Sequence, residues 1–147
     1  MTLETWRYFM SFREKSAWIT LILMLLVSVI YFLHVPLTLV PPPNSWMLRA
    51  LVYCIIIFIV IELIAHLVLF LRYPKDARTP KDEREILIDL KATRIAAYVY
   101  VLGSFLAVWT IHIGANQITV GNGVLLAFVI AEIINYSARI YYYRRGV

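Results

Sequence analysis

Residues 72–94 read RYPKDARTPKDEREILIDLKATR, the one long charged run in a chain that is 62% hydrophobic. The run holds seven of the 14 Lys and Arg residues and five of the nine Asp and Glu residues. Long apolar segments flank it on both sides. Because such segments cross membranes, the run predicts a water-exposed connection between two pairs of membrane helices. We call residues 72–94 the charged joint.

Four segments are long and apolar enough to cross a bilayer, whose hydrocarbon core of about 30 Å requires roughly 20 helical residues. They cover about residues 17–39, 46–71, 95–113 and 121–143. With 16% charged residues and a mean hydropathy of +0.77, the 147-residue chain is too apolar for a typical soluble protein. The sequence therefore predicts one all-α membrane domain over residues 1–147. We expect a four-transmembrane-helix bundle with a cytoplasmic extension of the third helix.

Positive charge is divided unevenly between the two sides of this bundle. The N-terminal arm, the charged joint and the C-terminal end carry 13 of the 14 Lys and Arg residues, and the opposite turns carry Arg49. Basic residues stay on the cytoplasmic side of membrane proteins, so both termini are expected there. The net charge of +5 then reflects topology and contact with lipid head groups. The expected partner is the lipid bilayer, and no nucleic acid is expected.

Local signals predict where individual helices bend, begin and approach one another. Pro36 removes a backbone donor and predicts a kink near the end of the first span. Thr79 and Pro80 suit an N-cap and a first helical position, so a helix is expected to begin there and to continue into the third span. Gly103 and Ala107 form a small-xxx-small pair, which permits close helix approach.

Residues 81–98, KDEREILIDLKATRIAAY, resemble a segment found in small bacterial integral membrane proteins of unknown function. The shared pattern is D-E-R-x-x-x-I-x-x-K-A-x-x-x-A, placed just before a membrane helix. That group also has few spans and cytoplasmic termini. The resemblance implies a protein of the bacterial inner (cytoplasmic) membrane, and it carries over no activity and no site residue.

Two glutamates lie deep inside the predicted spans, Glu62 in the second and Glu132 in the fourth. At about 1.5 Å per residue, each is roughly 14 Å inside the cytoplasmic boundary. An ionised carboxylate at that depth costs at least a few kcal/mol unless it is paired. His66 and Asn135 lie about one turn nearer the cytoplasm, and Arg139 lies two turns from Glu132. These five residues are the candidate polar or ion site, and the alternative is a buried polar clamp between helices.

The same residues and two outer histidines are also candidates for metal or haem binding. Glu62, His66 and Glu132 are possible metal ligands, but the paired Glu-x-x-His motifs of di-metal bundles do not occur in the sequence. His34 and His112 would suit a haem, although histidines at helix ends more often meet water and lipid head groups. We therefore expect no metal and no cofactor.

The charged joint permits two interpretations. Mixed charges at a helix end usually serve to solvate it. Alternatively, the joint docks a cytoplasmic partner, because clustered opposite signs suit a specific surface. The candidate docking residues are Asp82, Glu83, Arg84, Glu85, Lys91 and Arg94.

No catalytic motif is visible: the sequence lacks G-x-S-x-G, H-E-x-x-H and a phosphate-binding glycine loop. Four helices also leave little room for a gated pathway within one copy. We therefore expect a non-enzymatic accessory or regulatory membrane protein, which assembles as a homo-oligomer or with a membrane-protein partner. The alternative is a small proton- or ion-coupled transporter that uses Glu62 and Glu132.

Overall fold

The structure is a computed structural model that describes residues 10–35 and 46–145, except for the side chains of residues 46–48. Its elements are α2 (Phe12–His34), α3 (Trp46–Arg72), α4 (Pro74–Arg78), α5 (Glu83–Trp109), the 3-10 turn η1 (Thr110–Ile113) and α6 (Gln117–Arg145). Within the described residues, four helices are long and apolar enough to cross a membrane. The predicted all-α fold with four spanning helices is confirmed, and the chain is a multi-pass membrane protein.

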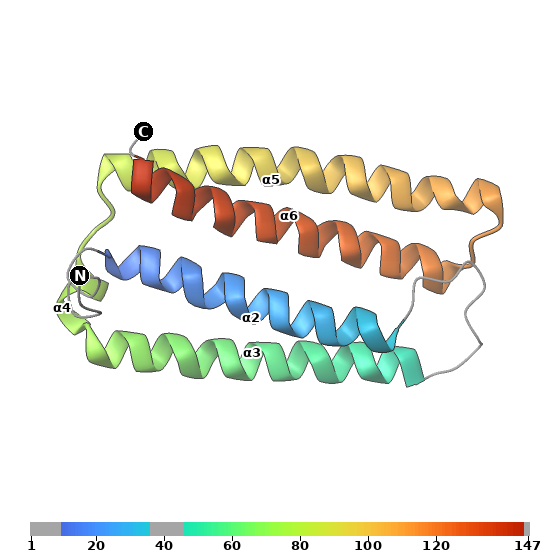
Figure 1. Cartoon of the computed structure of the whole chain (residues 1–147), viewed down its shortest axis with the longest axis horizontal. Coiled ribbons are helices and arrows are strands. Elements are labelled where there is room, and N and C mark those ends of the chain that lie inside the picture. The colour runs from blue at the N-terminus through green and yellow to red at the C-terminus, as the bar shows by residue number, and fades with distance from the viewer. Residues whose placement is uncertain (1–9, 36–45, 146–147) are drawn as a thin grey trace, which may run out of the picture.

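The long helices lie side by side in the order α5, α6, α2, α3 (Figure 1). The most extensive contact joins α5 to α6, followed by α2 with α6 and α2 with α3. Helices α2 and α6 therefore form the centre of the bundle, and α3 and α5 are its outer members. The start of α2, the end of α3, the start of α5 and the end of α6 share one end of the bundle, which we call the charged end (Figure 1). We call the other end the opposite end.

Helix α2 ends at His34, five residues before the end of the first predicted span. Val35 follows with φ −116° and ψ 84°, outside the helical region. The ring of a proline disfavours helical conformation in the residue before it, and residue 36 is Pro36. The helix therefore stops before the proline, and the expected kink is replaced by a helix end. Residues 36–39 of the predicted span lie outside the described residues.

The predicted start of the third helix at Thr79 and Pro80 is wrong. Helix α5 begins at Glu83 with Asp82 as its N-cap, because the Asp82 carboxylate accepts from the Glu83 N–H at 2.7 Å. The Glu85 carboxylate accepts from the Asp82 N–H at 3.2 Å, which completes a capping box. Thr79 instead ends α4 and donates to the Lys75 carbonyl. From Glu83 the helix runs unbroken to Trp109, so the predicted continuation into the third span is confirmed.

Small residues hold α5 and α6 close together, as the spacing of Gly103 and Ala107 predicts. A Cβ added at Gly103 would lie 2.7 Å from the Cβ of Ala127, and one added at Gly123 would lie 2.9 Å from the Cβ of Ala107. Carbon atoms in contact normally stay about 3.5–4.0 Å apart. The two helices therefore approach to a distance that only glycine permits at these two positions.

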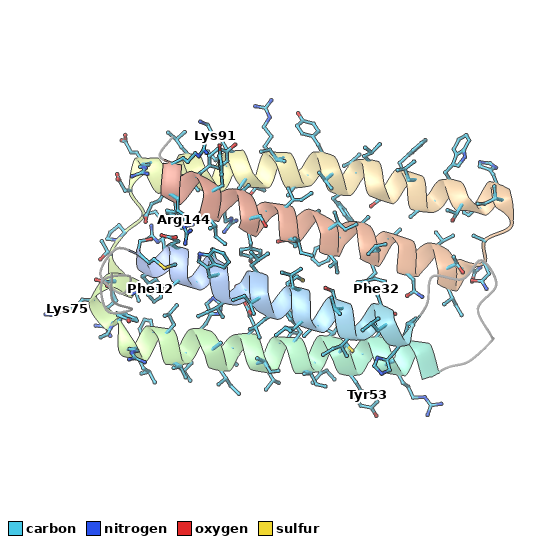
Figure 2. All side chains as sticks on the ribbon, in the orientation of Figure 1. Phe12, Phe32, Tyr53, Lys75, Lys91 and Arg144 are labelled. Atoms are coloured by element: carbon cyan, nitrogen blue, oxygen red, sulfur yellow. The ribbon has the colours of Figure 1, made fainter. Side chains whose placement is uncertain are left out.

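Large apolar side chains cover the outside of the bundle, particularly on α3 and α5. Leu63 is 69% exposed and Val101 is 66% exposed. Tyr53 points away from the other helices at the edge formed by α3 (Figure 2). Such a surface is unfavourable in water and suits contact with lipid chains.

Candidate functional site

A cavity of about 240 Å³ lies at the charged end, lined by side chains from α2, α3, α5 and α6. We call it the polar cavity. Its inner wall carries hydroxyl, carboxylate, imidazole and guanidinium groups, from Ser16, Thr20, Glu62, His66, Tyr136 and Arg139. Three of the sequence-predicted site residues, Glu62, His66 and Arg139, therefore face one space.

Glu62 and His66 are held by two hydroxyl groups of α2. The Thr20 hydroxyl donates to Glu62 Oε1 at 2.5 Å, and Ser16 Oγ lies 2.8 Å from His66 Nε2. His66 Nδ1 lies 3.0 Å from the Glu62 backbone carbonyl. A carbonyl oxygen only accepts, so Nδ1 carries the hydrogen, and Nε2 of the neutral ring accepts from Ser16. Both pairs are thus satisfied across the α2–α3 contact.

The second oxygen of Glu62 has no such partner. Oε2 is buried and makes no hydrogen bond within the described part of the chain. The Glu62 side chain as a whole is 22% exposed and lines the polar cavity. Buried polar atoms nearly always have a partner, so this oxygen is available to something that enters the cavity.

Glu132 belongs to a separate chain of contacts along α6. Asn135 Nδ2 donates to Glu132 Oε2 at 3.2 Å, and Arg139 Nε donates to Asn135 Oδ1 at 3.2 Å. Arg139 Nη1 then lies 3.5 Å from Asp89 Oδ1 on α5. The expected reach of Arg139 toward Glu132 is therefore made through Asn135. Glu132 and Asn135 are not part of the cavity lining.

Tyr136 connects the two groups of predicted residues. Its side chain lines the polar cavity near Thr20, and Thr20 donates to Glu62. It also interacts electrostatically with Glu132 and with Glu62. Among the described contacts the two carboxylates share no direct hydrogen bond, and Tyr136 is the residue that lies near both.

The prediction from the sequence missed three of the six polar residues on the inner wall: Ser16, Thr20 and Tyr136. A usable signal existed for the first two. Ser16 and Thr20 are four residues apart, as are Glu62 and His66, and residues four apart share a helical face. Helices α2 and α3 are antiparallel, so Thr20, four residues after Ser16, lies opposite Glu62, four residues before His66. The Ser16–His66 and Thr20–Glu62 contacts therefore form together.

Ion pairs border the mouth of the cavity at the charged end. Arg13 pairs with Glu85 and donates to the Thr79 carbonyl at 2.8 Å. Lys81 pairs with Asp89. These contacts connect α2 and the charged joint to the start of α5. Exposed pairs of this kind contribute about 0–1 kcal/mol each, so their role is mainly to position the helix ends.

A further ion pair joins the two hairpins beside the cavity. Arg144 Nε donates to Glu14 Oε1 at 3.1 Å, and Glu14 is 6% exposed. The Arg144 guanidinium also lies over the Trp18 ring. Because Glu14 is buried, loss of its partner would leave a carboxylate without compensation in an apolar setting.

Several candidate docking residues of the charged joint have contacts within the chain. Asp82 and Glu85 form the capping box of α5. Arg84 Nη2 donates to the Tyr143 carbonyl at 3.5 Å, and Lys91 lies over the Tyr142 ring. The other two candidates, Glu83 and Arg94, are exposed.

The D-E-R-x-x-x-I-x-x-K-A pattern has a structural explanation in this chain. Asp82 caps α5, and Ile88 and Ala92 are completely buried. Helix α5 packs on α6 through this apolar face, on which Ala96 is also buried. The spacing of the pattern therefore fits a capped helix that packs along one side.

Of the possible metal ligands, Glu62 and His66 lie together, with His66 Nδ1 3.4 Å from Glu62 Oε1, and Glu132 lies outside their cavity. Within residues 10–35 and 46–145, no group of three or more His, Cys, Asp or Glu side chains is placed to hold a metal ion. His34 Nδ1 lies 2.8 Å from the carbonyl of Ile30 in its own helix. His112 lies in η1 against the Trp109 ring.

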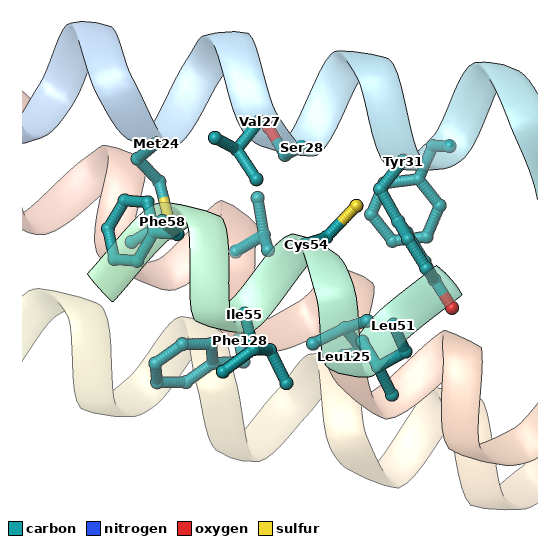
Figure 3. A pocket seen from close by; sticks show the side chains of 12 residues that line it. Met24, Val27, Ser28, Tyr31, Leu51, Cys54, Ile55, Phe58, Leu125 and Phe128 are labelled. Atoms are coloured by element: carbon teal, nitrogen blue, oxygen red, sulfur yellow. The ribbon is translucent and has the colours of Figure 1, made fainter. Parts of the chain in front are cut away.

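Beyond Glu62, toward the opposite end, the interior becomes apolar. A second cavity, of about 110 Å³, lies between α2, α3 and α6 and is lined by side chains such as Met24, Cys54, Phe58 and Phe128 (Figure 3). We call it the apolar cavity. Near its end the Tyr31 hydroxyl donates to Asn122 Oδ1 at 2.8 Å, and both residues are buried. This bond joins the two hairpins away from the charged end.

The polar cavity suits binding better than covalent catalysis. Ser16 and His66 have the separation of a nucleophile and its base. However, Ser16 lies inside α2, where its backbone N–H belongs to the helix and cannot stabilise an oxyanion. The remaining chemistry is that of hydroxyl oxygens around one carboxylate, which can take a proton or a small cation. No protein-family model, curated protein or solved structure matches this chain.

Proposed function

We propose that the chain is a small non-enzymatic accessory or regulatory membrane protein, which assembles with itself or with a membrane-protein partner. Its charged end faces the cytoplasm of a bacterium in this proposal. The observation that carries it is the one-sided arrangement of polar groups. The polar cavity opens at the charged end and reaches Glu62. Beyond it lies the apolar cavity, whose lining holds no charged side chain and which ends near the Tyr31–Asn122 pair. A conducting path through one copy would need polar groups along its full length.

The outer position of α3 supports assembly. Helix α3 packs mainly on α2, and side chains such as Ile57 and Leu63 are more than half exposed. Its remaining surface is available to lipid, to a second copy or to a partner helix. Apolar surface gives no preference for protein over lipid by itself, so assembly through α3 depends on the fit of its side chains.

Cross-linking in vesicles tests this proposal. In a cysteine-free background, Ile57→Cys on α3 and Val101→Cys on α5 place single thiols on the two outer helices. Assembly through α3 predicts disulfide dimers of Ile57→Cys that persist when the protein is diluted in lipid, and far fewer dimers of Val101→Cys. Equal, dilution-sensitive cross-linking at both positions would reflect random collision and would contradict the proposal.

A small proton- or ion-coupled transporter is the second candidate, because Glu62 has an unpartnered oxygen and Tyr136 lies near both Glu62 and Glu132. The test uses vesicles that contain the protein and a pH-sensitive dye. A transporter predicts ion-coupled flux that Glu62→Gln and Glu132→Gln each abolish with the fold intact. The accessory proposal predicts no flux from the unaltered protein, and neither substitution changes the signal.

A further inference from the structure

We propose that one anionic phospholipid binds in a groove on the surface of the bundle, between the start of α2 and the end of α3. The groove lies at the charged end and has a volume of about 360 Å³. The lipid phosphate lies between Lys15 and Arg72, and one acyl chain follows the apolar part of the groove. This inference goes beyond the proposed function, because lipid binding here requires neither a second copy nor a protein partner.

The charged side chains of the groove are all positive. Lys15 and Arg72 line it, and none of its described lining residues is Asp or Glu. Neither cation takes part in the ion pairs of the described chain. The acids nearest to them in sequence face elsewhere, because Glu14 pairs with Arg144 and Asp76 lines a different cavity. Two cations without an acidic partner suit a phosphate group, which both lysine and arginine bind.

Aromatic side chains place these cations at the level of the lipid head groups. Trp18 and Tyr73 line the groove, and Lys15 Nζ lies 3.9 Å from the centre of the Tyr73 ring. Trp and Tyr are enriched at the membrane–water interface, and Lys and Arg near helix ends extend their charged groups toward it. Basic pockets between membrane helices at this level bind lipid head groups.

The rest of the groove is apolar, and it runs toward the membrane interior. Its walls are formed by Ile19 of α2 and by Ala65, Val68 and Leu69 of α3. At about 1.5 Å per residue, Ala65 lies roughly 12 Å deeper along α3 than Tyr73. A free phosphate ion has nothing that matches this part, whereas a phospholipid carries acyl chains on the same molecule as its phosphate. The groove holds the phosphate and the first part of one chain, and the remainder of the lipid stays in the surrounding bilayer.

Thermal unfolding of the purified full-length protein in nanodiscs tests the site. The probe is phosphatidylglycerol, added in an increasing share to phosphatidylcholine nanodiscs. The expected result is a Tm that rises and then levels off, because a ligand that binds the folded state stabilises it. Inorganic phosphate added to pure phosphatidylcholine nanodiscs at equal ionic strength should leave the Tm unchanged. Native mass spectrometry from detergent should show a single tightly bound phosphatidylglycerol per chain and gives its Kd.

Substitutions assign the lipid to the two cations. Lys15→Gln combined with Arg72→Gln should raise the Kd for phosphatidylglycerol at least about tenfold, since each basic residue beside an anionic lipid contributes roughly fivefold. Arg72→Lys keeps the charge and should keep most of the affinity. Lys75→Gln combined with Arg94→Gln is the matched control, because it also removes two exposed cations and neither lines the groove. Lys75 points away from the bundle beside α4 (Figure 2).

Ala65→Phe tests the apolar part of the groove. The larger side chain fills the space and leaves both cations in place, so it should also weaken phosphatidylglycerol binding. This variant keeps the test decisive even if the double substitution of Lys15 and Arg72 does not fold. Unchanged binding in Ala65→Phe would mean that no acyl chain enters the groove and would overturn the proposal.

Three other results would also overturn it. The first is a Tm that does not depend on phosphatidylglycerol. The second is a Tm that rises without levelling off and does so equally in the two double variants, which would mean diffuse attraction to an anionic surface. The third is an equal rise with inorganic phosphate in pure phosphatidylcholine nanodiscs, which would mean a site for a free anion.

Discussion

Replacing Gly103 with alanine tests the tightest contact between α5 and α6. The new Cβ would lie 2.7 Å from the Cβ of Ala127, about 0.8 Å short of normal carbon contact. Ala127 cannot rotate its Cβ away, so the helices must separate, and overpacking of this kind costs about 1–3 kcal/mol. Alanine also favours the helix by up to about 1 kcal/mol relative to glycine. The expected net effect is therefore a loss of up to about 2 kcal/mol of unfolding free energy.

Two further variants make this prediction specific. Gly121→Ala adds the same methyl group on α6, where nothing lies within 4 Å, and should be neutral or slightly stabilising. Adding Ala127→Gly to Gly103→Ala removes the opposing Cβ and should recover at least half of the loss, as a double-mutant cycle would show. Reversible unfolding in mixed micelles with increasing SDS, followed by circular dichroism, gives the free energies. The reasoning fails if Gly103→Ala is as stable as Gly121→Ala, or if the cycle shows no coupling.

Three other predictions concern the ends of the bundle. Tyr31→Phe leaves the buried Asn122 oxygen without its donor and should cost about 1 kcal/mol in the same SDS titration, whereas unchanged stability would mean that the bond does not form in the membrane. Asp82→Ala removes the capping box and should cost about 1 kcal/mol, with faster hydrogen exchange in the first turn of α5; unaltered exchange there would argue against the cap. In a cysteine-free background, an impermeant thiol reagent applied to intact cells should label Gln117→Cys and not Arg78→Cys, and the reverse pattern would invert the proposed orientation.

The sequence predicts the four long helices well because their signal is local and large. Each span has roughly the length and apolarity that a bilayer requires. A span can therefore be recognised without knowing which side chains face the other helices. The exact ends of the helices depend on small energy differences between neighbouring capping residues. Thr79 and Asp82 are both good caps, and Asp82 prevails because Glu85 lies three residues later and completes the box. At Pro36 the choice was between a kink and a stop, and Val35 leaves the helix before the proline is reached.

The candidate site was predictable in part. Glu62 and His66 are conspicuous because charged and imidazole groups are rare in membrane segments. Their partners Ser16 and Thr20 are ordinary hydroxyl residues in an apolar helix, and they become meaningful once the register of α2 against α3 is known. The separation of Glu132 from the polar cavity depends on the rotation of α6 about its axis. That rotation is set by packing against α5, which apolar composition does not encode.

The uneven contacts between helices also determine how the molecule resists mechanical force. Helices α5 and α6 share the largest contact and interlock at Gly103 and Gly123, whereas α3 rests mainly on α2. A chain drawn out of the bilayer by its ends would therefore not yield all at once. Helix α3 would detach first, because its contact with α2 is the smallest of the three. Helix α2 would follow when Tyr31 releases Asn122, and the α5–α6 hairpin would stay in the bilayer as the more durable half.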